Sequence, residues 1–235
     1  MIRMQINGQD SETIYGFKYL RREIGSPTYG IYGREWPKNA LRPILGDRRV
    51  RYAPMQVILL YEGSEQLYED AKSRLLRDIA DSTITFSDLD FFFDVSLESS
   101  ETEKFRGTKY RELTLDLDIY AKYKAEITET ANRVSSRQLN VPATAETPAI
   151  IEITPSVDLI DIVISGFGET FTVKNLATGQ KVIVNGEDCI VTQAGANKYS
   201  DYIGWGFPVL HPEINALTFS QTSADITIKY KPRWL

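Results

Sequence analysis

The side chains that most often carry out catalysis are scarce in this sequence. His211 is the single histidine and Cys189 is the single cysteine. One histidine cannot supply a two-histidine zinc motif, and one cysteine can form neither an intrachain disulfide nor a cysteine-based zinc site. A Ser-His-Asp triad is possible by count, but the G-x-S-x-G turn that presents such a serine is absent from the sequence. We expect a structural or surface role for His211 and a buried position for Cys189, which precedes Ile190 and Val191.

Carboxylates offer a second possible chemistry. Asp88, Asp90 and Asp94 surround a run of three phenylalanines and could bind a cation or act as a glycosidase pair. Their position in an expected turn and strand favours a solvated face instead. The GFG at 166–168 lacks the third glycine and the following helix of a dinucleotide site. The sequence therefore predicts no catalytic residue, no metal ligand and no cofactor.

The charge distribution argues against nucleic-acid recognition. Residues 1–141 hold 21 Lys+Arg against 22 Asp+Glu, and residues 142–235 hold 6 against 10. Neither part has the basic excess that phosphate backbones require. No stretch approaches the roughly 18 apolar residues of a membrane span. We therefore expect neither sequence-specific nucleic-acid binding nor membrane insertion.

Residues 1–130 show the pattern of a β-rich domain with one helix. Leu113, Leu115, Leu117 and Ile119 alternate with polar residues, which predicts a strand with one wet face. The one clear helix is expected at about 65–80, after a Ser64 cap. Its apolar stripe is predicted as Leu67, Ala71, Leu75 and Ile79, and it must lie across a sheet to be buried.

The segment 25–47 fits neither pattern. It contains four glycines, three prolines and scattered aromatic residues, and it shows no clean period. A loop of this length without structure of its own is uncommon in a compact domain. Trp36 and the other apolar residues argue against simple disorder. We expect an arm that packs on another surface, and the arginines that follow it favour ion pairs between subunits.

The second half of the chain changes character. Residues 131–147 are rich in Thr, Ser, Asn and Pro, and we predict a linker there. Residues 148–235 form about seven short strands joined by turns, with no helix, which is typical of a β-sandwich or jelly roll. Tyr199, Tyr202 and Trp205 fall in one expected loop. They could stack against a sugar ring, or Trp205 could fill the open end of the core.

The order of these segments resembles the distal tail protein (Dit) family of siphophages. The resemblance starts with MQINGQDSETIYGFKY and continues through the strand, helix and strand of residues 48–98 to YRELTLDLDIYAKY. In the second half, FTVKNLATGQKVIVNGEDCIV, WGFPVLHPEINALTF and DITIKYKPRWL are similar to the family's C-terminal domain. The individual motifs are short, and their order across two domains carries the resemblance.

This resemblance implies a mainly β fold. Its first domain would be a β-sandwich or split-barrel-like domain with one helix and a long belt loop, and its second a galectin-like (jelly-roll) sandwich. It also implies a homohexameric ring at the phage tail tip, assembled in the cytoplasm of the bacterial host. Its partners would be the major tail protein, the tail-associated fibre or lysin protein and a receptor-binding protein. The residues expected at the belt interface are Tyr29, Tyr32, Trp36, Leu41, Arg42, Ile44, Arg48, Arg49 and Arg51.

Two other functions stay open at this point. The first is a carbohydrate-binding module that recognises cell-surface saccharide through Tyr199, Tyr202 and Trp205. HPEIN and GWGF do not reproduce the sugar-binding set of true galectins, so scaffolding is the favoured role of the second domain. The second is a glycosidase that uses Asp and Glu side chains.

Overall fold

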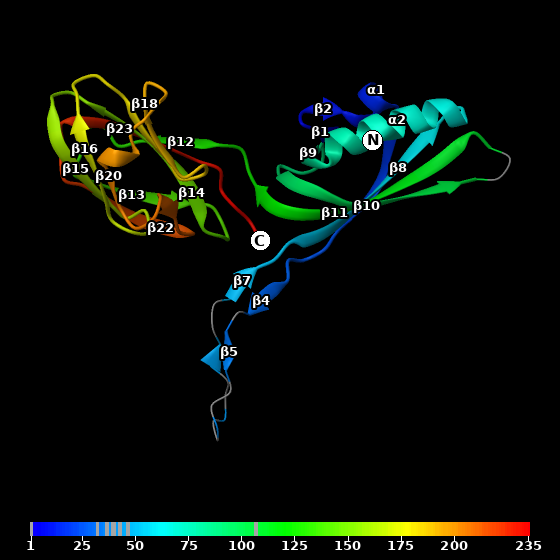
Figure 1. Cartoon of the computed structure of the whole chain (residues 1–235), viewed down its shortest axis with the longest axis horizontal. Helices are drawn as coiled ribbons and strands as arrows, with labels where there is room; N and C mark the ends of the chain where they lie inside the picture. Colours follow the sequence, from blue (N-terminus) through cyan, green and yellow to red (C-terminus); the bar gives the residue numbers. More distant parts are fainter. Residues whose placement is uncertain are drawn as a thin grey trace. The chain divides into compact units, whose positions relative to one another are not determined.

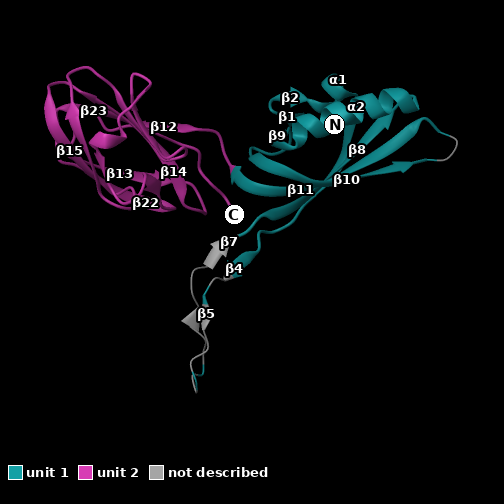
Figure 2. Cartoon of the chain, in the orientation of Figure 1, with its two compact units in different colours: residues 1–122, 235 teal, residues 123–234 magenta. Residues whose placement is uncertain are grey.

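The chain folds into two compact units. The computed structural model describes residues 2–31, 33–35, 38, 41, 44–45, 48–105 and 108–235. The first unit is Met1–Lys122 with Leu235, and the second is Tyr123–Trp234 (Figure 2). The predicted mainly β fold class is confirmed, and the first unit has a short helix at Ser11–Tyr15 in addition to the one predicted. In the described residues, neither helix is long and apolar enough to cross a membrane.

The first unit is built on one sheet of seven strands, in the order β2-β1-β9-β10-β11-β8-β3. Both helices of this unit lie on the same face of the sheet (Figure 1). The strands are β1 (Met4–Ile6), β2 (Gln9–Asp10), β3 (Phe17–Ile24), β8 (Ala53–Glu62), β9 (Asp81–Phe86), β10 (Phe92–Lys104) and β11 (Tyr110–Tyr123), and the helices are α1 (Ser11–Tyr15) and α2 (Glu65–Ile79).

Helix α2 begins where the sequence predicts, but its apolar stripe is shifted by one residue at the start. The Ser64 hydroxyl accepts a hydrogen bond from the Leu67 N–H at 3.4 Å. Leu67 is 59% exposed, and Tyr68 is buried in its place, followed by Ala71, Leu75 and Ile79. Tyr68 can enter the core because its ring meets the rings of Phe17 and Tyr61 at centroid distances of 5.9 and 5.5 Å.

Strand β11 has the predicted alternation. Leu113, Leu115 and Leu117 are buried on the side of the helices. Glu112 and Asp116 point to the opposite side, where they are half-buried. This second face of the sheet, called the open face below, carries polar side chains, as expected for a sheet covered on one side.

The segment between β3 and β8 contains paired strands, where the sequence analysis predicted a belt loop at 25–47 without strands. We call residues 25–52 the arm. In it, β4 (Tyr29–Ile31) pairs with β7 (Arg48–Val50), and β5 (Arg34–Glu35) pairs with β6 (Ile44–Leu45). The Gly25 N–H donates to the Pro54 carbonyl, and the Arg51 N–H donates to the Thr28 carbonyl. Backbone hydrogen bonds hold these strands together although their side chains do not alternate regularly between apolar and polar. The sequence pattern therefore did not predict the strands.

The register of β3 and β8 continues through the arm. Ile24 pairs with Met55, Tyr29 with Val50, and Glu35 with Ile44, so the same alignment runs from the sheet to β5 and β6. At about 3.3 Å per residue, the ribbon from Ile24 to Glu35 is roughly 36 Å long. That length is about the diameter of a small domain.

The second unit is a sandwich of two sheets. One sheet has the order β12-β23-β14-β17-β18-β19, with β21 also paired to β14, and the other has the order β13-β22-β15-β16-β20. The strands are β12 (Ile127–Thr130), β13 (Ser136–Val141), β14 (Thr147–Pro155), β15 (Leu159–Ser165), β16 (Phe171–Leu176), β17 (Val182–Asn185), β18 (Ile190–Gln193), β19 (Ala196–Asn197), β20 (Tyr202–Ile203), β21 (Val209–Leu210), β22 (Glu213–Phe219) and β23 (Ala224–Tyr230).

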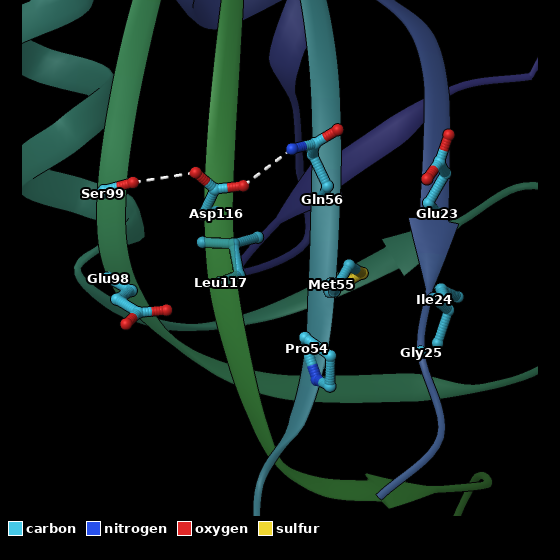
Figure 3. A pocket seen from close by; sticks show the side chains of 10 residues that line it. All are labelled: Glu23, Ile24, Gly25, Pro54, Met55, Gln56, Glu98, Ser99, Asp116 and Leu117. Atoms are coloured by element: carbon cyan, nitrogen blue, oxygen red, sulfur yellow. Dashed lines mark hydrogen bonds between the residues drawn. The ribbon is translucent and has the colours of Figure 1, made fainter.

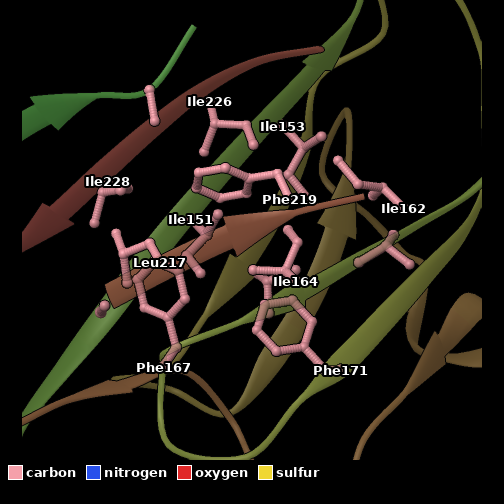
Figure 4. Packing of buried hydrophobic residues seen from close by; sticks show 14 of the residues in the cluster. Ile151, Ile153, Ile162, Ile164, Phe167, Phe171, Leu217, Phe219, Ile226 and Ile228 are labelled. Atoms are coloured by element: carbon pink, nitrogen blue, oxygen red, sulfur yellow. The ribbon is translucent and has the colours of Figure 1, made fainter. Parts of the chain in front are cut away.

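The core of the second unit lies between these sheets. Ile151 and Ile153 from one sheet face Ile164, Leu217 and Phe219 from the other (Figure 4). The expected boundaries need correction, because the predicted linker 131–147 contains β13. This strand pairs with β22 along its whole length, and β12 pairs with β23. Polar alternation in these edge strands resembles a linker when it is seen in sequence alone.

Two turns in this unit explain short motifs. Gly166 has φ +93°, and a Cβ there would overlap the carbonyl of Ala216. The GFG motif is therefore a turn that requires glycine. In HPEIN, the buried Asn215 side chain accepts from the His211 N–H at 2.9 Å and donates to the His211 carbonyl at 2.8 Å. This asparagine holds the turn that contains Glu213, whose φ is +69°.

Candidate functional site

His211 and Cys189, the two residues with possible catalytic chemistry in the second unit, are both exposed. His211 Nδ1 is 3.4 Å from a carboxylate oxygen of Glu146, and both side chains are exposed. Cys189 is exposed, so the prediction that it is buried was wrong. Its φ is +56°, and it ends a turn in which Asn185 accepts hydrogen bonds from the N–H groups of Glu187 and Asp188. Its thiol lies 3.9 Å from the Gly186 carbonyl, across the same turn. The apolar neighbours Ile190 and Val191 in the sequence did not reveal this turn.

Two of the three aspartates near the phenylalanine run accept hydrogen bonds from other side chains of the first unit. Asp88 accepts two hydrogen bonds from Arg22, at 3.0 and 2.8 Å, and the Arg22 bond lowers the pKa of Asp88. Asp94 accepts from the Thr83 hydroxyl at 2.6 Å. In the part of the chain that the structure describes, no group of three or more His, Cys, Asp or Glu side chains is placed to hold a metal ion.

The arm presents side chains that its own unit does not cover. Leu41 is 91% exposed, and Tyr52, Tyr29 and Arg51 are also exposed. Of the other residues expected at the belt interface, Ile44 lies in β6, and Arg48 and Arg49 lie in β7. Tyr32, Trp36 and Arg42 lie outside the described residues.

The arm also differs in charge from the rest of its unit. Residues 25–52 contain six Lys+Arg and two Asp+Glu. Residues 1–122 as a whole contain 18 Lys+Arg and 20 Asp+Glu, so the first unit without the arm has 12 against 18. The arm therefore has a formal charge of +4, and the remainder of the unit has −6.

The open face has a depression of about 650 Å³ at the root of the arm. Four neighbouring strands contribute Ser99, Asp116, Gln56 and Glu23 to it (Figure 3). Of the described residues that line it, three are acidic and none is basic: Glu23, Glu98 and Asp116.

Hydrogen bonds fix one of these carboxylates. Asp116 accepts from the Gln56 amide at 2.9 Å and from the Ser99 hydroxyl at 2.8 Å. Both bonds favour the ionised form, first the one from Gln56 and then the one from Ser99, and they lower the pKa of Asp116. The depression therefore stays negative at neutral pH.

Sequence reasoning missed this depression. Its residues come from β3, β8, β10 and β11, which are far apart in the chain. Only the strand register brings them together, so no local sequence motif predicts the depression. The alternation of β11, which places Asp116 opposite the helices, is the one signal that pointed to this face.

The three aromatic residues of the predicted sugar site are split by the structure. Trp205 is 98% exposed, so it does not fill the end of the core. Tyr202 is buried, and its hydroxyl donates to the Gly206 carbonyl. Burial raises the pKa of Tyr202 to about 12. Tyr199 is half exposed and stacks on Tyr202 and Phe207, at centroid distances of 6.0 and 6.2 Å. Trp205 and Tyr199 are exposed, and Tyr202 stacks on Tyr199.

Comparison with known proteins matches both units. Residues 142–234 match the family model described as siphovirus-type tail component, C-terminal domain. The chain is similar to the Dit protein of phage SPP1, with 17% sequence identity, a TM-score of 0.76 and coverage of 100% of both chains. It is also similar to a chain of the phage p2 baseplate in its activated conformation with Sr, with 12% identity, a TM-score of 0.51 and coverage of 100% of both chains. No curated protein sequence matches it.

Proposed function

We propose that this protein is a structural component of a phage tail tip. The premise is that residues 142–234 match the siphovirus-type tail component family and that the whole chain has the Dit fold. Copies of the chain form a homohexameric ring. The SPP1 relative is described as a paradigm of the hub adsorption apparatus in phages that infect Gram-positive bacteria.

The observation that carries this proposal is the arm. A ribbon about 36 Å long has the reach to cross a neighbouring unit of similar width. Leu41 and Tyr52 are exposed on it. Each Å² of their apolar surface that a neighbour covers stabilises the association by about 25 cal/mol. In a cyclic ring, one such head-to-tail contact repeats at every interface and closes on itself. The arm thus acts as a belt between subunits.

The ring joins the major tail protein above it to the tail-associated fibre or lysin protein below it. The second unit then docks proteins of the host-adsorption apparatus, such as a receptor-binding protein. The virion is the place of action, and assembly takes place in the host cytoplasm. The protein contributes position and symmetry, and it has no enzymatic activity.

Deletion of residues 26–46 tests the belt. We expect a folded protein with the mass of one chain, because the pairing of β3 with β8 does not depend on the arm. Native mass spectrometry and light scattering measure the mass, and circular dichroism checks the fold. A ring of unchanged size after this deletion would contradict the proposal.

The exposure of Trp205 favours a second candidate function, recognition of a saccharide. Trp205 and Tyr199 would stack against sugar rings, since aromatic faces suit the apolar side of a sugar. Tryptophan fluorescence titrated with host cell-wall saccharide tests this candidate, with Trp36→Phe/Trp234→Phe as a background that leaves Trp205 as the only tryptophan. Quenching that is lost in Tyr199→Ala of this background would support binding, and no quenching at millimolar saccharide would exclude it.

A further inference from the structure

The two outward faces of the sandwich differ in charge. On the sheet that contains β14 and β23, the carboxylate of Glu152 pairs with two lysines. On the other sheet, in the order β13-β22-β15-β16-β20, the described outward positions carry no charge apart from Asp161 and Lys174, which are register partners at one border. We call the rest of this outward side, from Gln138 on β13 to Ile203 on β20, the uncharged face.

Hydrogen-bonding side chains lie on four of the five strands of the uncharged face. Gln138 and Asn140 are exposed on β13. Ser165 on β15 and Thr218 on β22 are register partners, and their hydroxyl oxygens are 3.0 Å apart. Thr172 is the outward residue of β16 that pairs with β20. Amides and hydroxyls both donate and accept hydrogen bonds, as the hydroxyl groups of a sugar do.

Apolar side chains lie among these polar groups. Ile214 and Ile203 are 70% and 52% exposed, and Val163 and Ala216 are also exposed. They suit the apolar side of a sugar ring, which exposes carbon-bound hydrogens. Within the border given above, the described side chains include no lysine or arginine to bind a phosphate or carboxylate group. The chemistry of the face therefore fits an uncharged saccharide and not an anionic polymer.

Trp205 lies at the β20 edge of the uncharged face, and the packing of its neighbours fixes its position. It is separated from Ile203 by Gly204, where an added Cβ would lie 2.9 Å from the Tyr202 hydroxyl. Gly204 thus packs inward, and the exposed side chains on either side of it lie outward. The Tyr202 hydroxyl also donates to the Gly206 carbonyl. An aromatic ring held in this way loses little conformational entropy when it stacks on a ligand.

We propose that the uncharged face and Trp205 together bind an extended, uncharged polysaccharide. The proposal rests on saccharide recognition, the second candidate function above, and names the class of saccharide and its path. At the usual spacing between neighbouring strands, the five strands span about 19 Å. A ligand that stacks on Trp205 and also reaches the amides of β13 must therefore contain several sugar rings. The site prefers a polysaccharide chain to a single sugar.

Fluorescence titration of the Trp36→Phe/Trp234→Phe protein tests this proposal. The probes are the neutral and the phosphate-bearing polysaccharides purified from the cell wall of the host bacterium. We expect the neutral polysaccharide to quench Trp205 to the same extent at low and high salt, because no charges make the contact. We expect no quenching by the phosphate-bearing one.

Variants at the far side of the face test the path of the ligand. Gln138→Ala/Asn140→Ala removes two amides and should weaken binding of the neutral polysaccharide about tenfold. Ala216→Arg places a long charged side chain opposite Gln138 in the register and should weaken it at least as much. Both are made in the background with Trp205 as the only tryptophan, so the ring that reports binding is unchanged.

A matched control lies on the other sheet. Thr128→Ala/Thr130→Ala removes two exposed polar side chains from β12, which is an edge strand like β13. This variant should bind the neutral polysaccharide as the background protein does. Thermal unfolding of each variant shows that the fold persists.

The outcomes separate this proposal from the functions proposed above. If quenching is lost in Tyr199→Ala but is unchanged in both variants of the uncharged face, saccharide recognition holds and the path is wrong. If the phosphate-bearing polysaccharide binds as tightly as the neutral one, the class of saccharide is wrong. Quenching by neither polysaccharide would exclude saccharide recognition itself. The ring is tested separately, by the mass of the assembled protein.

Discussion

The second unit and the arm differ in whether their apolar side chains are buried or exposed. In the second unit, Ile151, Phe167 and Leu217 are fully buried between two sheets. In the arm, Leu41 lies between the paired strands β5 and β6 and is 91% exposed. The sandwich buries its apolar side chains within one chain, whereas Leu41, Tyr29 and Tyr52 of the arm are exposed. A segment of the second kind indicates an assembly function, because folding alone gives no reason for its length.

The core of the sandwich should show the largest effect on stability. Ile151→Ala removes a fully buried side chain and should lower the free energy of unfolding of this unit by about 2–5 kcal/mol. Ile160→Ala, at an exposed position in the same unit, is the control and should change it by less than about 0.5 kcal/mol. Thermal and denaturant unfolding measure both. Equal effects would mean that the sandwich core is not closed as described.

The turn at Gly166 should show the next largest effect. A Cβ at this position would overlap the Ala216 carbonyl, and its φ of +93° is strained for any other residue. Gly166→Ala should cost about 1–3 kcal/mol of stability. Gly179→Ala is a matched control, since its φ is also positive but no atom lies within 4 Å of the added Cβ. A cost no greater than that of the control would show that the close approach is absent.

In contrast to the core substitutions, substitutions on the arm should weaken assembly more than they lower the stability of the single chain. Leu41→Ser should change the melting temperature little, because Leu41 is already exposed in the single chain. It should weaken assembly, and we expect about 1 kcal/mol per interface from the apolar surface that is no longer buried. Sedimentation velocity measures assembly, and calorimetry of the dissociated chain measures stability. A fall in stability without a change in assembly would place Leu41 in its own subunit's core.

The smallest effect concerns an ion-pair cluster on the surface of the sandwich. Burial alone would raise the pKa of Glu152, but hydrogen bonds from Lys181 and Lys229 outweigh it and lower this pKa below 4.5. The ionised form is therefore favoured in the folded state. Its contribution is complete above the unfolded pKa and is lost as the pH falls through the lowered folded pKa.

The variant Glu152→Gln tests whether stability falls with pH because Glu152 becomes protonated. Between pH 7 and pH 3, the unaltered protein should lose about 1 kcal/mol more stability than the variant. Denaturant unfolding at a series of pH values gives the difference. A larger loss in the variant would mean that Glu152 is stabilised in its protonated form.

Patterns that depend on one element were predictable from the sequence. The alternation of β11 identified Leu113, Leu115 and Leu117 as core, and Ser64 identified the start of α2. Tyr68 replaced Leu67 in the stripe because a tyrosine with aromatic neighbours can be buried as readily as a leucine. The helix spacing alone does not decide between adjacent positions.

Features that depend on register or on backbone conformation were not predictable. Glu23, Glu98 and Asp116 meet only because four strands align in one particular register. Cys189 is an exposed residue in a turn at a positive φ, and Trp205 is exposed between two glycines. The arm lacks alternation, so its strands emerged only from the backbone pairing. Each of these features depends on how separate segments pair or on the backbone conformation of a turn, which the residue pattern of a single segment does not show.

The central claim is that the arm connects identical subunits into a closed ring. Native mass spectrometry of the full chain, beside the chain without residues 26–46, tests it most directly. The account predicts a dominant species of six times the 26.7 kDa chain for the full protein and a single-chain species for the shortened one. A full chain with the mass of one copy at every concentration would contradict it.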